Sequence, residues 1–561
     1  MSRSAALGAI VIAAIALAWA MPLQSVGCAQ SAHYAATRSI AEGHPDIDRY
    51  KNETCDLVRI NGHYYAAKGP ALELWSAPFY LLLRSVGAVP ANPNAGLRYP
   101  DAMAGVPLRA VWQIGLWAVV LPAIGLLLLI RRAVEWIEPG LGTAVAAILG
   151  LGTLVLPFST LLFAHVPAAA LAFLAFCLLV RERLQPGCNA TWLHVMSAGA
   201  AAGLAVAVDL PLALPAVLIG LYAGTRQPRL RRLATFGFGG LVGLLPLFAF
   251  DTWAFGNPLH LPYAGTAGQG ASGGWQATGF FGQGLPSFRI VVELLLSQRG
   301  LLVMTPVVAA GVAGCVLLWR RGFRSEAGLI AALVLVELVW NSARHPVGFA
   351  LGGWSPGPRF LIPLLPFLCF ALAPALRRAP ATVGALALIS TGAMVIATSA
   401  EPLLQNDDTR HWLSRIVHGN FVPTVVSLGG VGHGWLAIVP FYALVLVAVA
   451  AAILATPLPV SRRDLLMAGA AVLAWILVEH GAPELLRVDR LVHEPWGLLA
   501  AIGLVAAAVW AVLRLRPEGL LLVPFATVRF DDHTKWALLL ALLALAALAL
   551  HGQMRRPLGP A

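Results

Sequence analysis

Residues 46 to 75 read DIDRYKNETCDLVRINGHYYAAKGPALELW and form the only long polar run among the first hundred residues. Only 11% of the chain is charged, so a stretch this rich in ionisable groups is exceptional. Its acidic groups are Asp46, Asp48, Glu53, Asp56 and Glu73, and its basic groups are Arg49, Lys51, Arg59, His63 and Lys68. Because isolated charges are costly to bury, we expect this stretch to meet water and to carry the chemistry of an otherwise apolar chain.

The composition of the chain indicates whether the rest of it is surrounded by water or by lipid. Of 561 residues, 59% are hydrophobic, and the mean hydropathy is +0.77, which is outside the range of water-soluble domains. The sequence therefore predicts an integral membrane protein. Residues 5–24 resemble a secretory signal, but apolar spans continue to the end of the chain without a polar domain, so we expect them to form the first transmembrane helix.

Apolar runs close to the ~20 residues that a bilayer requires recur along the whole chain. They lie near residues 5–24, 110–130, 141–160, 164–180, 195–209, 211–224, 233–252, 301–319, 327–341, 357–376, 379–398, 435–456, 464–480, 496–513 and 536–551. The predicted fold is all-α and polytopic, with about 13–15 transmembrane helices and a polar platform on the outer face. We divide it into a core of residues 1–400, which includes a first outer loop at 25–109, and additional helices over 401–561.

Arginines next to the spans predict the orientation. They fall on every second connection, at Arg3, Arg131, Arg132, Arg181, Arg183, Arg226 to Arg232, Arg320 to Arg324, Arg377, Arg378, Arg462, Arg463, Arg514 and Arg516. The positive-inside rule places all of these in the cytoplasm, with the N-terminus inside. The net charge of +12 is then explained by topology and by contact with anionic membrane lipids, and it does not indicate nucleic-acid binding.

The same orientation gathers every polar loop on the outer face. These loops are 25–109, 158–165, 253–300, 341–356, 399–434 and 481–495. A channel or carrier needs ionisable groups along a path through the bilayer, and Glu337 is the main ionisable residue inside a predicted span. The pattern favours an enzyme that works at one membrane surface.

Two of the six cysteines, Cys28 and Cys55, lie in the first outer loop, on the oxidising side of a bacterial membrane. A disulfide between them would close a loop of about 27 residues and contribute roughly 3 kcal/mol on a chain-entropy argument; free thiols are the alternative. The other cysteines lack metal-ligand spacing and are interpreted as apolar fillers; they are Cys177, Cys188, Cys315 and Cys369.

Two segments resemble an established superfamily. The first combines Tyr34-Ala35, Gly43, Lys68-Gly69-Pro70 and Trp75, and the second reads Trp354-Ser355-x-Gly357-Pro358-Arg359-Phe360 followed by Pro363-x-x-Pro366. Over residues 28–90 and 340–370 the chain resembles the protein O-mannosyltransferase and aminoarabinose-transferase superfamily, integral-membrane glycosyltransferases of the type-C fold. The resemblance implies a polyprenyl-phosphate sugar as donor and an extracytoplasmic acceptor, which is a lipid, a glycan or a protein.

The chain departs from the superfamily pattern at two places. The acidic residue expected just ahead of Tyr34 is replaced by Ala29, Gln30 and Ser31, and the first proline of a Lys-Pro-Pro motif is Gly69. The catalytic carboxylate therefore has to be argued from chemistry.

Inverting transfer from a lipid-linked phosphate needs a carboxylate that takes the proton of the acceptor hydroxyl. Asp46 and Asp48 are the candidates, and two carboxylates at this spacing would also suit a divalent metal ion beside the donor phosphate. The structural alternatives are a turn residue after Pro45 and a helix cap. Asp56 is the next candidate, for contact with the substrate, and a solvated loop charge is its alternative.

The reaction also needs cations where negative charge builds up on the leaving phosphate. Lys68 is the first candidate, and a lysine that only reaches toward the headgroups is its alternative. Arg359 is the second, because a lone arginine at an outer helix end opposes the positive-inside bias; its alternative is an interfacial anchor or a partner for Glu337. Arg344 is the third, and together with His345 it would otherwise only cap a span.

A further group is expected to line the sugar pocket, and its members are His63, Tyr64, Tyr65, His165, Asp209 and His345. An interfacial aromatic belt explains the tyrosines equally well, and a hydrogen-bonded interfacial histidine is the alternative for His165. The glycine-rich part of the loop 253–300 is predicted to be a lid over the donor.

These features predict a membrane glycosyltransferase of the bacterial inner membrane, with its site on the extracytoplasmic face. One alternative is a transporter or flippase of lipid-linked sugars, which would show broken helices with ionisable residues near mid-bilayer. Another is a glycan ligase or polymerase, which uses similar chemistry on the same side.

Overall fold

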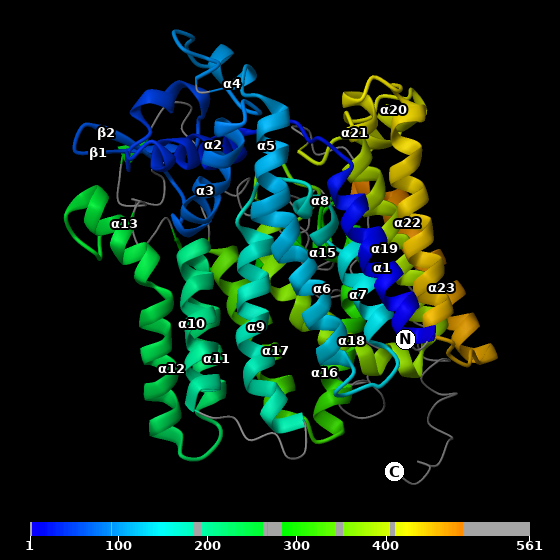
Figure 1. The fold of residues 1–561 in the computed structure, drawn as a ribbon. Coiled ribbons are helices and arrows are strands. Elements are labelled where there is room, and N and C mark those ends of the chain that lie inside the picture. The colour runs from blue at the N-terminus through cyan, green and yellow to red at the C-terminus, as the bar shows by residue number, and fades with distance from the viewer. Residues whose placement is uncertain are drawn as a thin grey trace.

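The computed structural model describes residues 3–90, 92–184, 192–261, 266–267, 283–343, 352–403 and 410–485. It shows an almost entirely helical protein whose long helices run side by side (Figure 1). Within the described residues, six helices are long and apolar enough to cross a membrane, and the number rises to eight if each of two bent helix pairs is one span. The chain is an all-α, polytopic integral membrane protein, as predicted.

The helices of the apolar part coincide with every predicted span up to residue 480. They are α1 (Arg3–Ala20), α5 (Leu108–Gly115), the π-helix η2 (Leu116–Val120), α6 (Leu121–Val134), α7 (Gly142–Leu151), α8 (Val155–Ser159), α9 (His165–Leu184), α10 (Trp192–Val208), η3 (Leu210–Leu212), α11 (Ala213–Ala223), α12 (Arg229–Gly243), α13 (Leu245–Phe255), α14 (Phe288–Leu296), α15 (Leu301–Met304), α16 (Val308–Arg320), α17 (Arg324–Ser342), η7 (Arg359–Leu364), α18 (Leu365–Arg378), α19 (Pro380–Ala400), α22 (Trp435–Ala455) and α23 (Arg462–Leu485). The short helices α20 (Arg410–Val417) and α21 (Val425–Leu428) precede α22. The predicted spans 496–513 and 536–551 lie outside the described residues.

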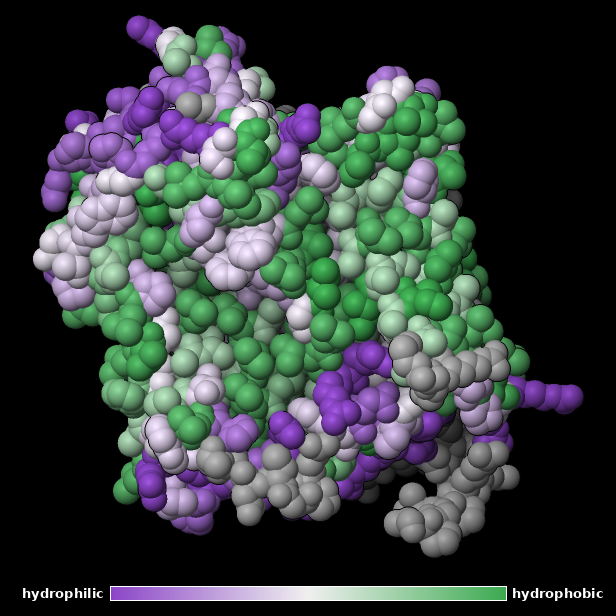
Figure 2. Space-filling model, viewed as in Figure 1, coloured by the Kyte–Doolittle hydropathy of each residue, from purple (hydrophilic) through white to green (hydrophobic). Residues whose placement is uncertain are grey.

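The apolar surface forms a belt between two polar ends (Figure 2). One polar end is the platform formed by the first outer loop, and the basic connections lie at the opposite end of the helices (Figure 1). There Glu138 pairs with Arg321 and with Arg377, whose Nε is 2.9 Å from the Glu138 carboxylate. The predicted segregation of the two kinds of polar segment is therefore confirmed within the described residues.

The platform contains helices and a small antiparallel sheet, ordered β2-β1-β3. Its elements are α2 (Cys28–Ala41), η1 (Asp48–Glu53), β1 (Leu57–Ile60), β2 (His63–Ala66), α3 (Ala71–Ser85), α4 (Asp101–Ala104) and β3 (Thr266–Ala267). The hairpin register pairs Leu57 with Ala66. Asn61 and Gly62 form its turn with φ angles of +51° and +90°, as expected for an Asn-Gly hairpin turn.

Helix α2 is enclosed by protein. Every residue from Ala29 to Ser39 is buried, against α3, η1 and β2. A disulfide between Cys28 and Cys55 ties the start of α2 to the segment before β1, with the Cα atoms 5.2 Å apart. Packing and a covalent link therefore hold the platform together.

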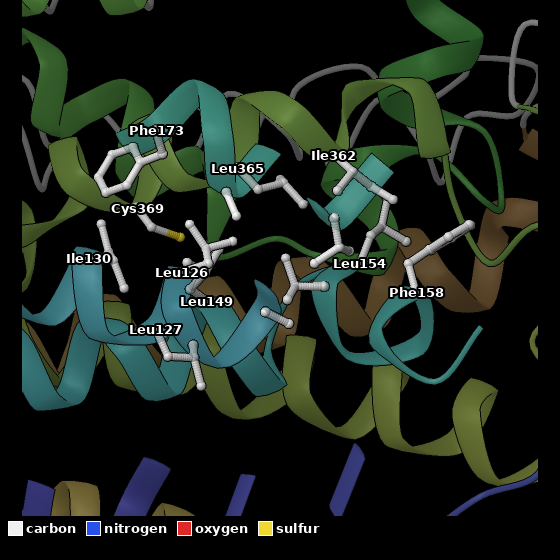
Figure 3. Packing of buried hydrophobic residues seen from close by; sticks show 14 of the residues in the cluster. Leu126, Leu127, Ile130, Leu149, Leu154, Phe158, Phe173, Ile362, Leu365 and Cys369 are labelled. Atoms are coloured by element: carbon white, nitrogen blue, oxygen red, sulfur yellow. The ribbon is translucent and has the colours of Figure 1, made fainter. Parts of the chain in front are cut away.

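The core of the helical part lies between α6, α7, α8, α9, η7 and α18. Figure 3 shows Leu126 and Ile130 of α6, Leu149 of α7, Phe173 of α9 and Cys369 of α18 packed against one another, and all five are buried. Because lipid is as apolar as these side chains, close packing rather than exclusion from water holds the helices together. This core fixes the first residues of α9 and η7, which belong to the site.

Helices α10 and α12 approach each other through glycines. A Cβ at Gly203 would lie 2.1 Å from the carbonyl oxygen of Gly240, and one at Gly199 would lie 2.0 Å from that of Phe236. Small residues allow such backbone contact between membrane helices. The contact fixes α10, whose last residue precedes Asp209.

Candidate functional site

Lys68 lies on the short connection between β2 and α3. Its ammonium pairs with the carboxylate of Asp56, which directly precedes β1. The next residue, Gly69, is pressed against the end of α10, since a Cβ there would lie 2.6 Å from the carbonyl oxygen of Ala207 and 2.9 Å from that of Val208. Close packing thus explains why glycine stands in place of the first proline of a Lys-Pro-Pro motif. The same contact fixes Lys68 beside the platform end of α10.

His165 and Asp209 form a buried pair near Lys68. His165 is the first residue of α9, and Asp209 directly follows α10. The His165 Nδ1 and Asp209 Oδ2 atoms are 2.7 Å apart, and the two side chains are 8% and 11% exposed. Both Lys68 and Arg359 lie close enough to act on His165 electrostatically. The structure therefore gathers two predicted substrate residues and two predicted phosphate-binding cations.

Arg359 is the first residue of η7 and lies against aromatic rings. Its guanidinium carbon is 5.0 Å from the centre of the Phe163 ring and 5.3 Å from that of Phe360. The same two rings contact His165, at centroid distances of 5.9 and 5.5 Å. Gly352 has a φ of +88°, and a Cβ there would lie 2.5 Å from Arg359 Cγ. Glycine at position 352 therefore allows this loop to lie directly against the arginine.

Arg299 holds that loop in place, although it belongs to no motif that would have predicted this role. The Arg299 guanidinium donates hydrogen bonds to the carbonyl oxygens of Gly353 at 3.0 Å and Ser355 at 2.9 Å. The arginine is 7% exposed. It acts on the site through the position of the loop that precedes Arg359.

A second buried histidine–carboxylate pair also lies beside Phe163. The Nδ1 atom of His33, on α2, is 2.7 Å from Oε1 of Glu73, on α3, and the side chains are 2% and 1% exposed. The His33 and Phe163 rings are in edge contact at a centroid distance of 6.4 Å. Neither residue was predicted to belong to the site, because only the packing of α2 on α3 brings them together.

Asp46, Asp48 and His63 form a separate, more exposed cluster, called the outer cluster below. The His63 Nδ1 and Asp48 Oδ2 atoms are 2.7 Å apart, and the side chains are 59% and 37% exposed. The other Asp48 oxygen accepts the backbone N–H of Tyr64 at 2.7 Å. One ligand atom from each residue of the outer cluster lies within 4.8 Å of the others. Two carboxylates and an imidazole suit a divalent transition metal.

The outer cluster predicts a pH dependence. The hydrogen bond to Asp48, followed by the charges of Asp48 and Asp46, raises the pKa of His63 above its ordinary value of about 6.5. Because the pKa of His63 is higher in the folded state than in the unfolded state, protonated His63 stabilises the folded protein at pH values below the unfolded-state pKa. This stabilisation is lost as the pH rises through the folded-state pKa. NMR titration should therefore give a higher pKa for His63 in the wild type than in Asp48→Asn, and equal values would contradict the contact.

The tyrosines of β2 have different surroundings. The Tyr64 ring lies under Lys51, whose ammonium is 4.9 Å from its centre, and the Arg59 guanidinium is 5.8 Å away. Tyr65 packs on Phe255 of α13 and donates a hydrogen bond to the carbonyl oxygen of Ala254 at 3.4 Å. Tyr65 therefore docks the hairpin on α13, while Tyr64 packs on the side of the sheet that faces α2 and η1.

Several predicted features fall outside the described residues. These are Arg344, His345 and most of the glycine-rich segment that was predicted to be a lid. Their predicted roles stay predictions.

The chain matches no protein-family profile and no curated protein in sequence. It is similar to ArnT from Cupriavidus metallidurans. The crystal structure of ArnT in the apo state matches with a TM-score of 0.47 and 15% sequence identity, over 99% of this chain and 89% of ArnT. The structure of ArnT bound to undecaprenyl phosphate matches with a TM-score of 0.45 and 14% identity, over 97% of this chain and 88% of ArnT.

Proposed function

We propose that the chain is a glycosyltransferase that moves a sugar from a polyprenyl-phosphate donor to an extracytoplasmic acceptor, with inversion at the anomeric carbon. The observation that carries this proposal is the position of Lys68 and Arg359 beside the buried His165–Asp209 pair. Lys68 comes from the platform, and Arg359 is the first residue of η7. A donor whose lipid chain lies against the apolar belt can place its phosphate beside the positive charges of Lys68 and Arg359.

The chemistry explains why cations belong here. Negative charge builds up on the phosphate as the bond between sugar and phosphate breaks, and charges that are already in place stabilise it most effectively. The Lys68 side chain is 20% exposed, and Arg359 lies against two aromatic rings. Asp56 orients the Lys68 ammonium before the donor arrives, and the phosphate then shares that ammonium.

The outer cluster belongs to the proposal as the predicted base and metal site. Asp46 or Asp48 is predicted to take the proton of the acceptor, and both to hold a divalent metal ion, with His63 as a third candidate ligand. Such an ion would add positive charge near the donor phosphate.

The proposal also places the chain in the bacterial inner membrane with the platform outside. The support is the collection of basic connections at the end opposite the platform (Figure 1), since positive loops stay in the cytoplasm. The acceptor is then a glycan, lipid or protein of the cell envelope.

The activity can be tested directly. Purified protein is incubated with a panel of undecaprenyl-phosphate sugars and with an envelope extract as the source of acceptor. We expect one donor to yield free undecaprenyl phosphate and a glycosylated product, both detected by mass spectrometry. Failure of every donor in the panel to release undecaprenyl phosphate would contradict the proposal.

A transporter or flippase of lipid-linked sugars is the second candidate, because the structure contains bent spans. Helices α12 and α13 meet at 44°, and the pair Glu293–Met304 and Val308–Arg320 at 91°. Asp251 of α13 is 0% exposed, and among the described residues neither of its carboxylate oxygens has a hydrogen-bond partner. However, Asp251 lies only one turn before Ala254, which contacts the platform hairpin, so it is near the platform and not at mid-bilayer. Vesicles that move a labelled undecaprenyl-phosphate sugar across the bilayer without releasing the sugar would favour this candidate.

A further inference from the structure

Residues 54–56, called the 54–56 segment below, connect η1 to β1. Two of these residues are linked to the first residue of α2. The Thr54 hydroxyl donates a hydrogen bond to the carbonyl oxygen of Cys28 at 2.7 Å, and Cys55 forms the disulfide with Cys28. Thr54 is 0% exposed and Cys55 is 7% exposed, so water does not compete for the hydrogen bond. The segment is therefore fixed on α2 both covalently and by a buried hydrogen bond.

The third residue of the segment, Asp56, is held by the same threonine. Thr54 Oγ1 accepts the backbone N–H of Asp56 at 3.0 Å, so the hydroxyl group donates to α2 and accepts from Asp56 at the same time. The Asp56 carboxylate then pairs with the Lys68 ammonium. The contacts of the 54–56 segment with α2 therefore determine where this carboxylate lies.

Lys68 depends on this carboxylate, because the packing of Gly69 on the end of α10 fixes only the main chain beside it. The ammonium lies at the end of a flexible four-carbon chain, and the side chain is 20% exposed. If Asp56 were displaced, the ammonium would occupy several rotamers. Ordering it again would then cost side-chain entropy each time a phosphate binds.

Helix α2 is in turn linked to the segment that precedes His165. The Gln30 side chain of α2 accepts the backbone N–H of Leu162 at 3.2 Å, and Leu162 lies three residues before His165. The Gln30 amide also donates a hydrogen bond to the carbonyl oxygen of Ser25 at 2.7 Å. A continuous series of contacts therefore connects the segment before His165, through α2 and the 54–56 segment, with the Lys68 ammonium.

We propose that Thr54 and the Cys28–Cys55 disulfide are positioning elements of the donor site, which hold Asp56 where it orients the Lys68 ammonium for the donor phosphate. This inference rests on the proposed function, in which Lys68 binds that phosphate. Thr54 and the two cysteines act through Asp56 and do not touch the substrate. Tight donor binding therefore requires the oxidised form of the cysteine pair.

Undecaprenyl phosphate without a sugar is the probe, so the test does not depend on which sugar is transferred. Its dissociation constant is measured by calorimetry in detergent. Misplacing a functional group by about 1 Å can cost up to about 10²-fold. We therefore expect the dissociation constant to rise about tenfold in Cys28→Ser/Cys55→Ser and about fivefold in Thr54→Val, which removes the hydroxyl group and keeps the branched shape.

Thr37→Val is the matched control for Thr54→Val. Thr37 is also a threonine of the platform and is 1% exposed. Its hydroxyl donates to the carbonyl oxygen of His33 at 2.8 Å, within α2 and not to the 54–56 segment. This variant should bind undecaprenyl phosphate as the wild type does. If Thr54→Val also binds it with the wild-type dissociation constant, Thr54 has no positioning role.

A double-mutant cycle with Asp56→Ala distinguishes positioning from general stabilisation of the platform. If the two links act through Asp56, neither strand of the cycle should change the dissociation constant by more than about twofold once Asp56→Ala is present. A platform that is only less stable would lose the same factor in both backgrounds, and that result would overturn the inference. The unfolding temperature should fall in both backgrounds when the cysteines are replaced, because the disulfide also restricts the unfolded chain.

The remaining outcomes separate this inference from the proposed function. Iodoacetamide added to the denatured wild type without a reductant should leave Cys28 and Cys55 unlabelled, and labelling of both would overturn the role of the disulfide. A wild type that does not bind undecaprenyl phosphate counts against the proposed function itself. Wild-type binding that is unchanged in Thr54→Val and in Cys28→Ser/Cys55→Ser overturns this inference alone. If the cysteine variant does not fold, Thr54→Val and its cycle with Asp56→Ala decide.

Discussion

Replacing Lys68 with alanine is expected to lower kcat/KM for the polyprenyl-phosphate donor by about 10²–10³-fold, the loss typical of removing one preorganised group that stabilises transition-state charge. The substitution removes a cation near His165. It also leaves Asp56, whose side chain is 11% exposed, to repel the incoming phosphate. Initial rates of undecaprenyl phosphate release, together with donor binding by calorimetry, measure both effects.

Two further variants show whether this loss is specific. Lys51→Ala removes the other lysine of the first outer loop and should leave kcat/KM near the wild-type value. The double variant Lys68→Ala/Asp56→Asn should recover part of donor binding, because it also removes the unpaired carboxylate. Turnover in Lys68→Ala equal to that of the wild type would remove Lys68 from the site.

Much of the fold could be predicted because the bilayer imposes a strong pattern. The apolar runs coincide with helices, and the arginine-rich connections collect at one end, as hydropathy and charge require. The platform also carried local signals that the all-helical prediction left unused. Asn61-Gly62 between Leu57–Ile60 and His63–Ala66 is a strong hairpin signal, and the structure has that hairpin.

Residues of the site could be predicted only where a recognisable motif lies within one segment of the sequence. Lys68 and Arg359 belong to recognisable motifs, and the structure places both near His165. His33 and Glu73 could not be predicted in this way, because neither belongs to a recognisable motif of its own helix. Their pairing depends on how α2 packs on α3, which is a tertiary contact that neither periodicity nor local propensity encodes.

The platform should also depend strongly on Arg38. This arginine is 0% exposed, pairs with Glu53, and lies between Tyr34 and Tyr50 with its guanidinium carbon 4.1 and 3.8 Å from their ring centres. Breaking a buried ion pair from one side leaves an uncompensated charge, which costs about 3–5 kcal/mol. We therefore expect Arg38→Met to lower the unfolding temperature in detergent markedly and to expose the platform to limited proteolysis.

A double-mutant cycle shows where that cost comes from. Arg38→Met/Glu53→Met removes both charges while filling similar volume, so it should recover most of the lost stability, because a paired buried charge is often no better than apolar packing. Arg84 gives the matched control. It is 39% exposed, pairs with Glu42 at 2.8 Å on the same platform, and Arg84→Met should cost only about 0–1 kcal/mol. If the double variant is as unstable as Arg38→Met, the stacking of the guanidinium on the two tyrosines, and not the ion pair, stabilises the platform.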